Sequence, residues 1–261
     1  MTVLLVLVGT LVAVAAAVRS TWSPCGLSML STITPMSERA KGHSYRATAS
    51  WFVVGAAAGG VTLGGLSALG ALAVRQLGPS PLALAILTVG SASLAALSDL
   101  AIRGLTLPIH RRQVNERWLD QYRPWVYGAG FGWQIGVGLA TYITTAAAYL
   151  TVVLAALTTS PVAALAIGAC FGLVRGLAVL LTRSITTTSE LIAFHRRFTG
   201  MGPKARALVI ATEIGAAGVV AASLWLPAGG LVVVVLGAAT VASRAPDPLS
   251  RSVAVRQPES G

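Results

Sequence analysis

The stretch TVLLVLVGTLVAVAAAVRSTWSPCGLSMLSTITP, residues 2–35, decides the fold because it is apolar over almost its whole length. As one straight helix it would be about 50 Å long at roughly 1.5 Å per residue, whereas the hydrocarbon core of a bilayer is about 30 Å thick. The segment must therefore tilt, break or re-enter. Pro24 and Gly26 predict a break within residues 19–26, since proline removes a backbone donor and glycine adds backbone freedom.

The rest of the chain has the same character. Of its 261 residues, 55% are hydrophobic and 10% are charged, and the mean hydropathy is +0.76. So few charges cannot cover a water-exposed surface, which excludes a soluble enzyme, a disordered chain and a nucleic-acid-binding module. An all-α polytopic membrane protein remains, with seven spans predicted from apolar runs at 2–22, 49–74, 81–102, 125–157, 161–182, 207–226 and 228–243.

The basic residues predict the orientation of these spans. The net charge is +11, and most Lys and Arg fall in alternate connections, at 38–47, 103–124, 183–206 and after 243. The positive-inside rule places these connections in the cytoplasm. We therefore expect a bacterial plasma-membrane protein with its N-terminus outside and its C-terminus inside. Residues 1–18 lack a basic n-region, so they are interpreted as a retained span rather than a cleaved signal peptide.

The order of the runs predicts an internal repeat. Runs two and five both contain closely spaced glycines, and each follows an overlong run. Small residues at such spacing let helices approach closely. Because each unit has three spans, the second copy would be inverted, as in many transporters. We expect one transmembrane domain over 1–243, with repeats at 1–105 and 125–226, an extra span at 228–243, and a disordered cytoplasmic tail at 244–261.

The fourth run has a polar middle, TYITT at residues 141–145. It is either a long tilted helix whose hydroxyls bond back to the helix, or a second broken span. In the second case, broken spans one and four would border a site near the middle of the bilayer.

Four ionisable residues lie within the apolar runs: Arg19, Asp99, Arg175 and Glu213. Such residues usually face the interior of a helix bundle and are functional candidates. For Asp99 we expect an ion pair with Arg103, four residues later. Glu213 is a candidate for proton or cation coupling, and the two arginines are candidates for binding an anionic substrate. Two arginines and two carboxylates also permit two purely structural pairs.

The motif Ser23-Pro24-Cys25, with Pro35 downstream, resembles the first span of the CcdA/DsbD family of thiol-disulfide conduits, within the broader LysE-type exporter fold group. The resemblance covers about 15 residues. It implies that Cys25 is a redox thiol paired with a cysteine in the other repeat. The counterpart region at 141–145 has no cysteine, and Cys170 lies in the fifth run instead.

Three functions follow as hypotheses. The first is a small-solute permease or exporter, with a site formed by Arg19, Pro24, Cys25, Thr144, Thr145, Arg175 and Glu213. The second is electron transfer by Cys25 and Cys170 to a thioredoxin-like partner. The third is a non-catalytic scaffold that docks partners through 103–124 and 183–206. We favour a non-enzymatic role in the lipid bilayer, and the sequence is compatible with a homo-oligomer. Neither nucleic acid nor a cofactor is expected. No metal is expected either, because the three histidines lack the spacing of a metal site.

Overall fold

The structure, a computed structural model, describes residues 1–101, 122–139, 141–224 and 233. Within these residues the expected all-α class is confirmed. The elements are α1 (Thr2–Ser20), α2 (Pro24–Thr32), α3 (Pro35–Ala40), α4 (Tyr45–Gln76), α5 (Pro81–Asp99), α7 (Pro124–Val137), α8 (Ala147–Leu157), α9 (Pro161–Leu177), the 3-10 helix η2 (Ala178–Thr182), α10 (Thr188–Gly200) and α11 (Gly202–Leu224). The predicted seventh span and tail lie, apart from residue 233, outside the described residues.

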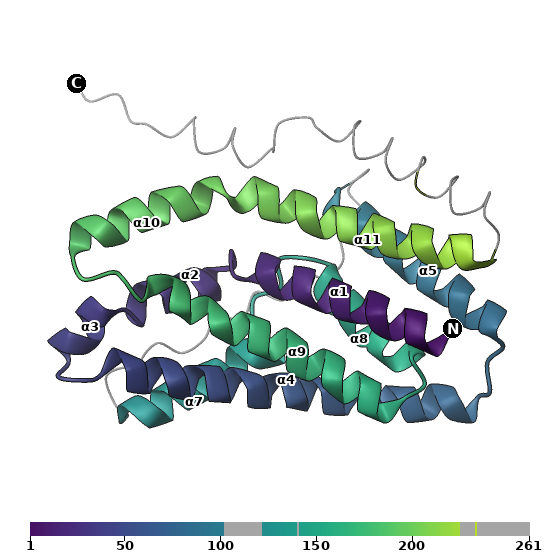
Figure 1. The fold of residues 1–261 in the computed structure, drawn as a ribbon, viewed down its shortest axis with the longest axis horizontal. Coiled ribbons are helices and arrows are strands. Elements are labelled where there is room, and N and C mark those ends of the chain that lie inside the picture. The colour runs from purple at the N-terminus through teal and green to yellow at the C-terminus, as the bar shows by residue number, and fades with distance from the viewer. Residues whose placement is uncertain (102–121, 140, 225–232, 234–261) are drawn as a thin grey trace, which may run out of the picture.

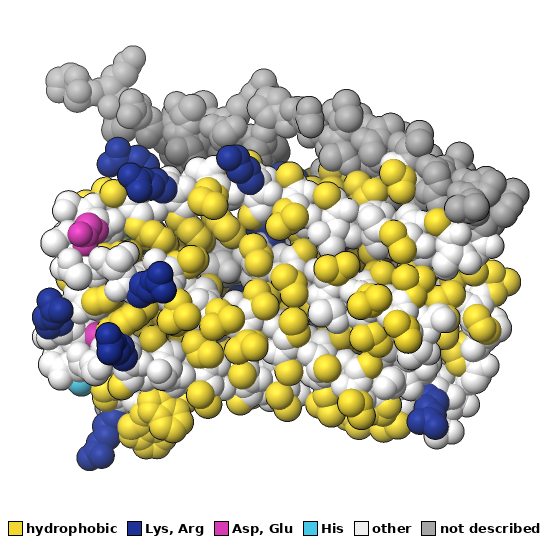
Figure 2. All heavy atoms as spheres, viewed as in Figure 1, with side chains coloured by type: hydrophobic (Ala, Val, Ile, Leu, Met, Phe, Trp, Pro, Cys, Tyr) yellow, Lys and Arg dark blue, Asp and Glu magenta, His cyan; other side chains and the backbone are white. Residues whose placement is uncertain are grey.

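The helices run mainly along the long axis of the molecule (Figure 1). Among the residues that the structure describes, five stretches are long and apolar enough to cross a membrane: Thr2–Ser20, Tyr45–Gln76, Pro81–Asp99, Pro161–Thr182 and Thr188–Leu224. On the visible face, hydrophobic side chains cover the middle, and Lys and Arg gather toward the end where α3 and α10 lie (Figure 2). Such an apolar belt next to a basic end is typical of a membrane protein.

Four of the described helices begin with the same two-residue N-terminal capping motif. A Ser or Thr hydroxyl accepts a hydrogen bond from the backbone N–H three residues later, and a proline occupies the first helical position. These pairs are Ser23-Pro24, Thr34-Pro35, Ser80-Pro81 and Ser160-Pro161. The hydroxyl satisfies one of the free N–H groups at the start of a helix, and proline removes another. Such a helix start needs less water, so it can lie at membrane depth.

Close backbone contacts hold α4 between α7 and α9. A Cβ added to Gly132 of α7 would overlap the carbonyl oxygen of Phe52 in α4. A Cβ added to Gly172 of α9 would lie 2.6 Å from the Cα of Gly60 in α4. Runs two and five thus approach each other through their glycines, as small residues permit. The glycines of α7 add a second interface of the same kind.

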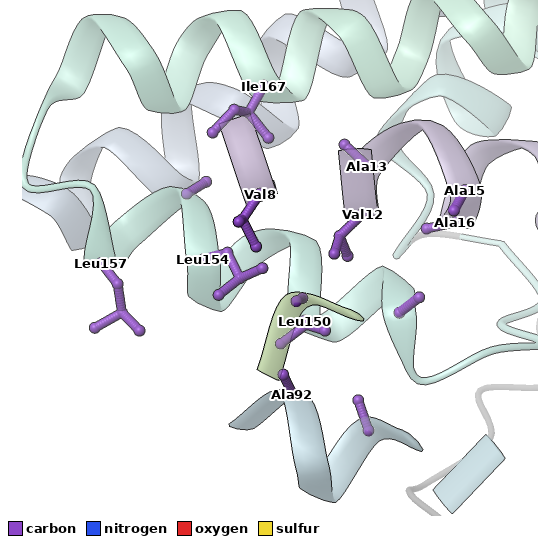
Figure 3. Close-up of a cluster of buried hydrophobic side chains, with 14 of the residues drawn as sticks. Val8, Val12, Ala13, Ala15, Ala16, Ala92, Leu150, Leu154, Leu157 and Ile167 are labelled. Atoms are coloured by element: carbon purple, nitrogen blue, oxygen red, sulfur yellow. The ribbon is translucent and has the colours of Figure 1, made fainter. Parts of the chain in front are cut away.

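Larger side chains fill the space between α1, α5, α8 and α9 (Figure 3). Val8 and Val12 of α1 lie in the same buried cluster as Leu154 of α8, Ile167 of α9 and Ala92 of α5. The cluster combines branched side chains with alanines, as close packing of helices requires. It joins the first span to the second half of the chain.

Both overlong runs are broken. In the first, α1 ends at Ser20 and α2 begins at Pro24, within the predicted interval. In the fourth, α7 ends at Val137 and α8 begins at Ala147. The alternative of one long tilted helix in run four is therefore wrong. The division into repeats at 1–105 and 125–226 stays a prediction.

Candidate functional site at the two breaks

The first break is a tight turn between α1 and α2. The backbone N–H groups of Thr21, Trp22 and Ser23 each donate to a carbonyl three residues earlier, at 3.1–3.2 Å. A Cβ on Gly26 would overlap the carbonyl oxygen of Thr21, so only glycine fits there. Cys25, which follows Pro24 in the first turn of α2, is 3% exposed. The break is thus closed by its own hydrogen bonds and buries the thiol.

The second break, residues 138–146, is closed by a carboxylate from another helix. Its first residue, Gly138, has φ +72°, a conformation that L side chains rarely adopt. The Oδ1 of Asp99 accepts from the backbone N–H of Ala146 at 2.7 Å, and its Oδ2 accepts from the Thr145 hydroxyl. Asp99, the last residue of α5, therefore caps the start of α8. Its expected partner, Arg103, lies outside the described residues.

Further charges surround this cap. The Nη2 and Nε of Arg206 donate to the backbone carbonyl oxygen of Asp99, at 2.7 and 3.2 Å. Arg19 is close enough to interact electrostatically with the Asp99 carboxylate, and Glu213 also lies within electrostatic range of it. Arg19, Asp99, Thr145, Arg206 and Glu213 are called the charged cluster below. It joins α1, α5 and α11 to the second break.

Glu213 is the least satisfied member of the charged cluster. Its side chain is fully buried, and among the described residues neither carboxyl oxygen has a hydrogen-bond partner. Its neighbour Asp99 is also a carboxyl, so it supplies no opposite charge to Glu213. Thr144, next to Thr145, also has a buried hydroxyl with no partner among the described residues. Such groups are costly in a membrane protein, which makes them candidates for a functional role.

Arg175 connects the two breaks. It is 2% exposed, and its Nη1 donates to the carbonyl oxygen of Ile135, in the last turn of α7, at 2.7 Å. Its guanidinium lies 5.7 Å from the centre of the Phe171 ring and interacts electrostatically with Cys25. A cation at a helix C-terminus satisfies free carbonyls and the helix dipole. Arg175 therefore stabilises the end of α7 directly before the second break.

The predicted site residues fall into two groups. Arg175 lies near Cys25, while Arg19, Thr145 and Glu213 belong to the charged cluster. Pro24 begins α2 and contributes no polar side chain. Cys25 and Cys170 are not joined by a disulfide, and Cys170 is half-buried on α9. Within the described residues, no group of three or more His, Cys, Asp or Glu could hold a metal ion.

Sequence reasoning missed a second buried polar centre, at the basic end. The Oε2 of Glu38 in α3 accepts from the hydroxyls of Thr48 in α4 and Tyr127 in α7, at 2.5 Å each. Glu38 is fully buried although it stands beside Arg39 in a basic segment. Nothing in the local pattern marks it as buried, because its partners come from two other helices. It ties the ends of three helices together.

Comparison with known proteins gives a partial match. The chain is similar to the methylamine utilization protein MauF of Methylophilus methylotrophus, 33% identical over 165 residues, which cover 61% of this chain and 56% of the relative. It is also similar to MauF of Paracoccus denitrificans, 32% identical over 174 residues, which cover 64% of this chain and 60% of the relative. The matches thus span about three fifths of these relatives. No family model and no solved structure matches.

These relatives correct the resemblance to the CcdA/DsbD conduits and LysE-type exporters, because the similarity is to MauF. The physical reason for the error is local. Ser23-Pro24 is a helix start that recurs at Ser80-Pro81 and Ser160-Pro161, where no cysteine follows. The predicted permease or exporter is wrong too, because the relatives are named for methylamine utilization. Its alternatives, thiol-disulfide transfer and a non-catalytic scaffold, are not supported either.

Proposed function

We propose that this chain is a membrane protein with a role in methylamine utilization. The observation that carries the proposal is its similarity to MauF proteins, which extends over 61–65% of the chain at 29–33% identity. The matched length is greater than any single span, so it reflects more than shared apolar composition. The five apolar stretches support a location within a membrane.

We propose further that the protein crosses the cell membrane several times with its basic end in the cytoplasm. The residues of this end include Arg39 and Lys41 near α3 and Arg196 and Arg197 on α10. In Figure 1 the N-terminus lies at the opposite end of the long axis, which supports an outside location for it. The predicted seventh span at 228–243 lies outside the described residues except for residue 233, and with it the C-terminus is expected inside.

The charged cluster and Arg175 are proposed as the residues on which the function depends. Asp99 and Arg175 satisfy backbone groups on the two sides of the second break, and Arg206 satisfies a carbonyl at the end of α5, all of which would otherwise be left free at membrane depth. Glu213 makes no such contribution among the described residues. Because a buried carboxyl with free oxygens lowers stability, we propose that Glu213 is retained for activity rather than for the fold.

Deletion of the gene in its own organism tests the role. Loss of growth on methylamine as sole nitrogen source, with normal growth on ammonium, is expected. A plasmid copy with Glu213→Gln should fail to restore growth on methylamine although the protein accumulates in the membrane. Thr212→Val is the matched control, since the Thr212 hydroxyl bonds only to its own helix, at Leu208, in the described structure.

Unchanged growth of the deletion strain on methylamine would refute the proposed role. Full restoration by Glu213→Gln would refute only the part assigned to that residue. Expression in Paracoccus denitrificans lacking its own MauF is a further test, in which restored growth would show that the two proteins are interchangeable.

A further inference from the structure

An apolar groove lies between α1 and α11, which run side by side (Figure 1). It extends from Leu4 and Val219 at one end to Val18 and Leu208 at the other and has a volume of about 560 Å³. The distance from Leu4 to Val18 along α1 is about 21 Å at roughly 1.5 Å per residue. The groove is therefore long and narrow and follows the direction of the spans.

Its walls and floor are built for an apolar ligand. Leu7 and Leu11 are 59% and 64% exposed along one wall, and Leu208 and Val219 are each 53% exposed along the other. Midway along α11, Gly215 leaves the floor open, because an added Cβ would meet no atom within 4 Å. Hydrophobic side chains dominate the visible face in this region (Figure 2).

One end of the groove is cationic. Lys204 precedes Leu208 by four residues, so it continues the groove-lining face of α11 by one turn. Arg19 follows Val18 on α1, and Trp22 lies one turn further along. Tryptophan is enriched at the level of lipid headgroups. This end of the groove faces the basic end of the molecule, where α10 lies (Figure 2).

We propose that the groove binds an anionic phospholipid, with one acyl chain between α1 and α11 and the phosphate beside Lys204. A negative headgroup complements this cation, and the apolar walls complement the chain. A lipid is favoured over a transmembrane helix of a partner because an anionic headgroup also complements the cation at one end of the groove.

Native mass spectrometry of the full chain, taken from nanodiscs of phosphatidylglycerol and phosphatidylcholine in equal amounts, tests the headgroup. We expect the retained lipid to be enriched in phosphatidylglycerol. Lys204→Glu should lower that enrichment by about fivefold or more, because one cation near an anionic lipid contributes about that factor to binding. Arg75→Glu is the matched control, because Arg75 is an exposed basic residue in the last turn of α4, at the opposite end. It should leave the enrichment unchanged.

A second pair of variants tests the groove itself. Gly215→Leu should fill the floor and reduce the retained lipid severalfold, whereas Gly90→Leu should not, although an added Cβ meets open space at both positions. Only variants with wild-type far-ultraviolet circular dichroism are compared. Equal retention of both lipids by the wild type, or equal retention by the two leucine variants, would overturn the proposal. So would a photocrosslinker at position 11 that captures protein instead of lipid.

Discussion

Replacing Gly172 with alanine tests the close contact between α4 and α9 most directly. The added methyl group would lie 2.6 Å from the Cα of Gly60 and 2.7 Å from its backbone nitrogen, and it would overlap the carbonyl oxygen of Ala56. These are backbone atoms on the facing helix, so no side-chain rotation can relieve the overlap. The two helices must separate.

The size of the effect follows from the distances. Carbon atoms pack best at about 3.5–4.0 Å, so the helices must move apart by roughly 1 Å at this point. A gap of that size removes a quarter to a half of the dispersion energy of the atoms that it separates. Overpacking costs about 1–3 kcal/mol in well-packed cores. Because the neighbouring contact of Gly168 with Gly64 also loosens, we expect a loss near the upper end, about 2–3 kcal/mol.

The assay is unfolding of the purified protein by sodium dodecyl sulfate in mild-detergent micelles, followed by circular dichroism. Gly90→Ala is the control, since an added Cβ there meets no atom within 4 Å. Removing an open helical glycine should stabilise slightly, by at most about 1 kcal/mol. Unfolding of both variants at the same detergent fraction would refute the close backbone contact.

Three further predictions address the polar centres and the turn at the second break. Glu38→Ala removes the acceptor that the Thr48 and Tyr127 hydroxyls share and leaves them only the longer contacts at 3.3 Å to the Ser44 carbonyl and 3.5 Å to each other. It should cost about 2–4 kcal/mol in the same titration, more than Tyr127→Phe, which removes one donor; equal costs would contradict the shared carboxylate. Asp99→Ala should speed hydrogen exchange at the first amides of α8 by at least about tenfold, which corresponds to a loss of roughly 1.4 kcal/mol. Unchanged exchange rates at these amides would exclude the capping role of Asp99. Gly138→Ala forces a side chain into φ +72° and to 2.6 Å from the Phe171 ring, so a loss of stability of roughly 1–3 kcal/mol is expected. It would be measured as a lower thermal midpoint, and an unchanged midpoint would be inconsistent with that turn.

The first break could be predicted from the sequence because its cause is local. Proline at residue 24 has no backbone donor, and this holds in any tertiary context. The second break could not be chosen over a long helix, since it depends on a carboxylate from α5 that lies 46 residues away in sequence from Thr145. Periodicity and composition carry no information about such a partner.

The buried charged residues show the same division between what local sequence predicts and what depends on tertiary contacts. The sequence indicates that Glu213 is buried, because it stands in an apolar run. It suggests opposite-charge pairs as its partners, whereas the structure places it near Asp99, a charge of the same sign. Glu38 is missed for the opposite reason, since it stands in a basic segment and is buried only by tertiary contacts. Glycines four residues apart in α7, at 128, 132 and 136, were a readable signal of the second close interface.

The contact of α4 with α7 and α9 restricts where the molecule can change shape. Backbone touching backbone leaves no side chain to re-pack, so these three helices cannot slide without losing the whole contact. They form a rigid plate. The first span, α5, α8 and α11 pack through flexible aliphatic side chains and enclose the charged cluster. Any conformational change that accompanies activity must then occur by movement of α1, α5, α8 and α11 relative to α4, α7 and α9.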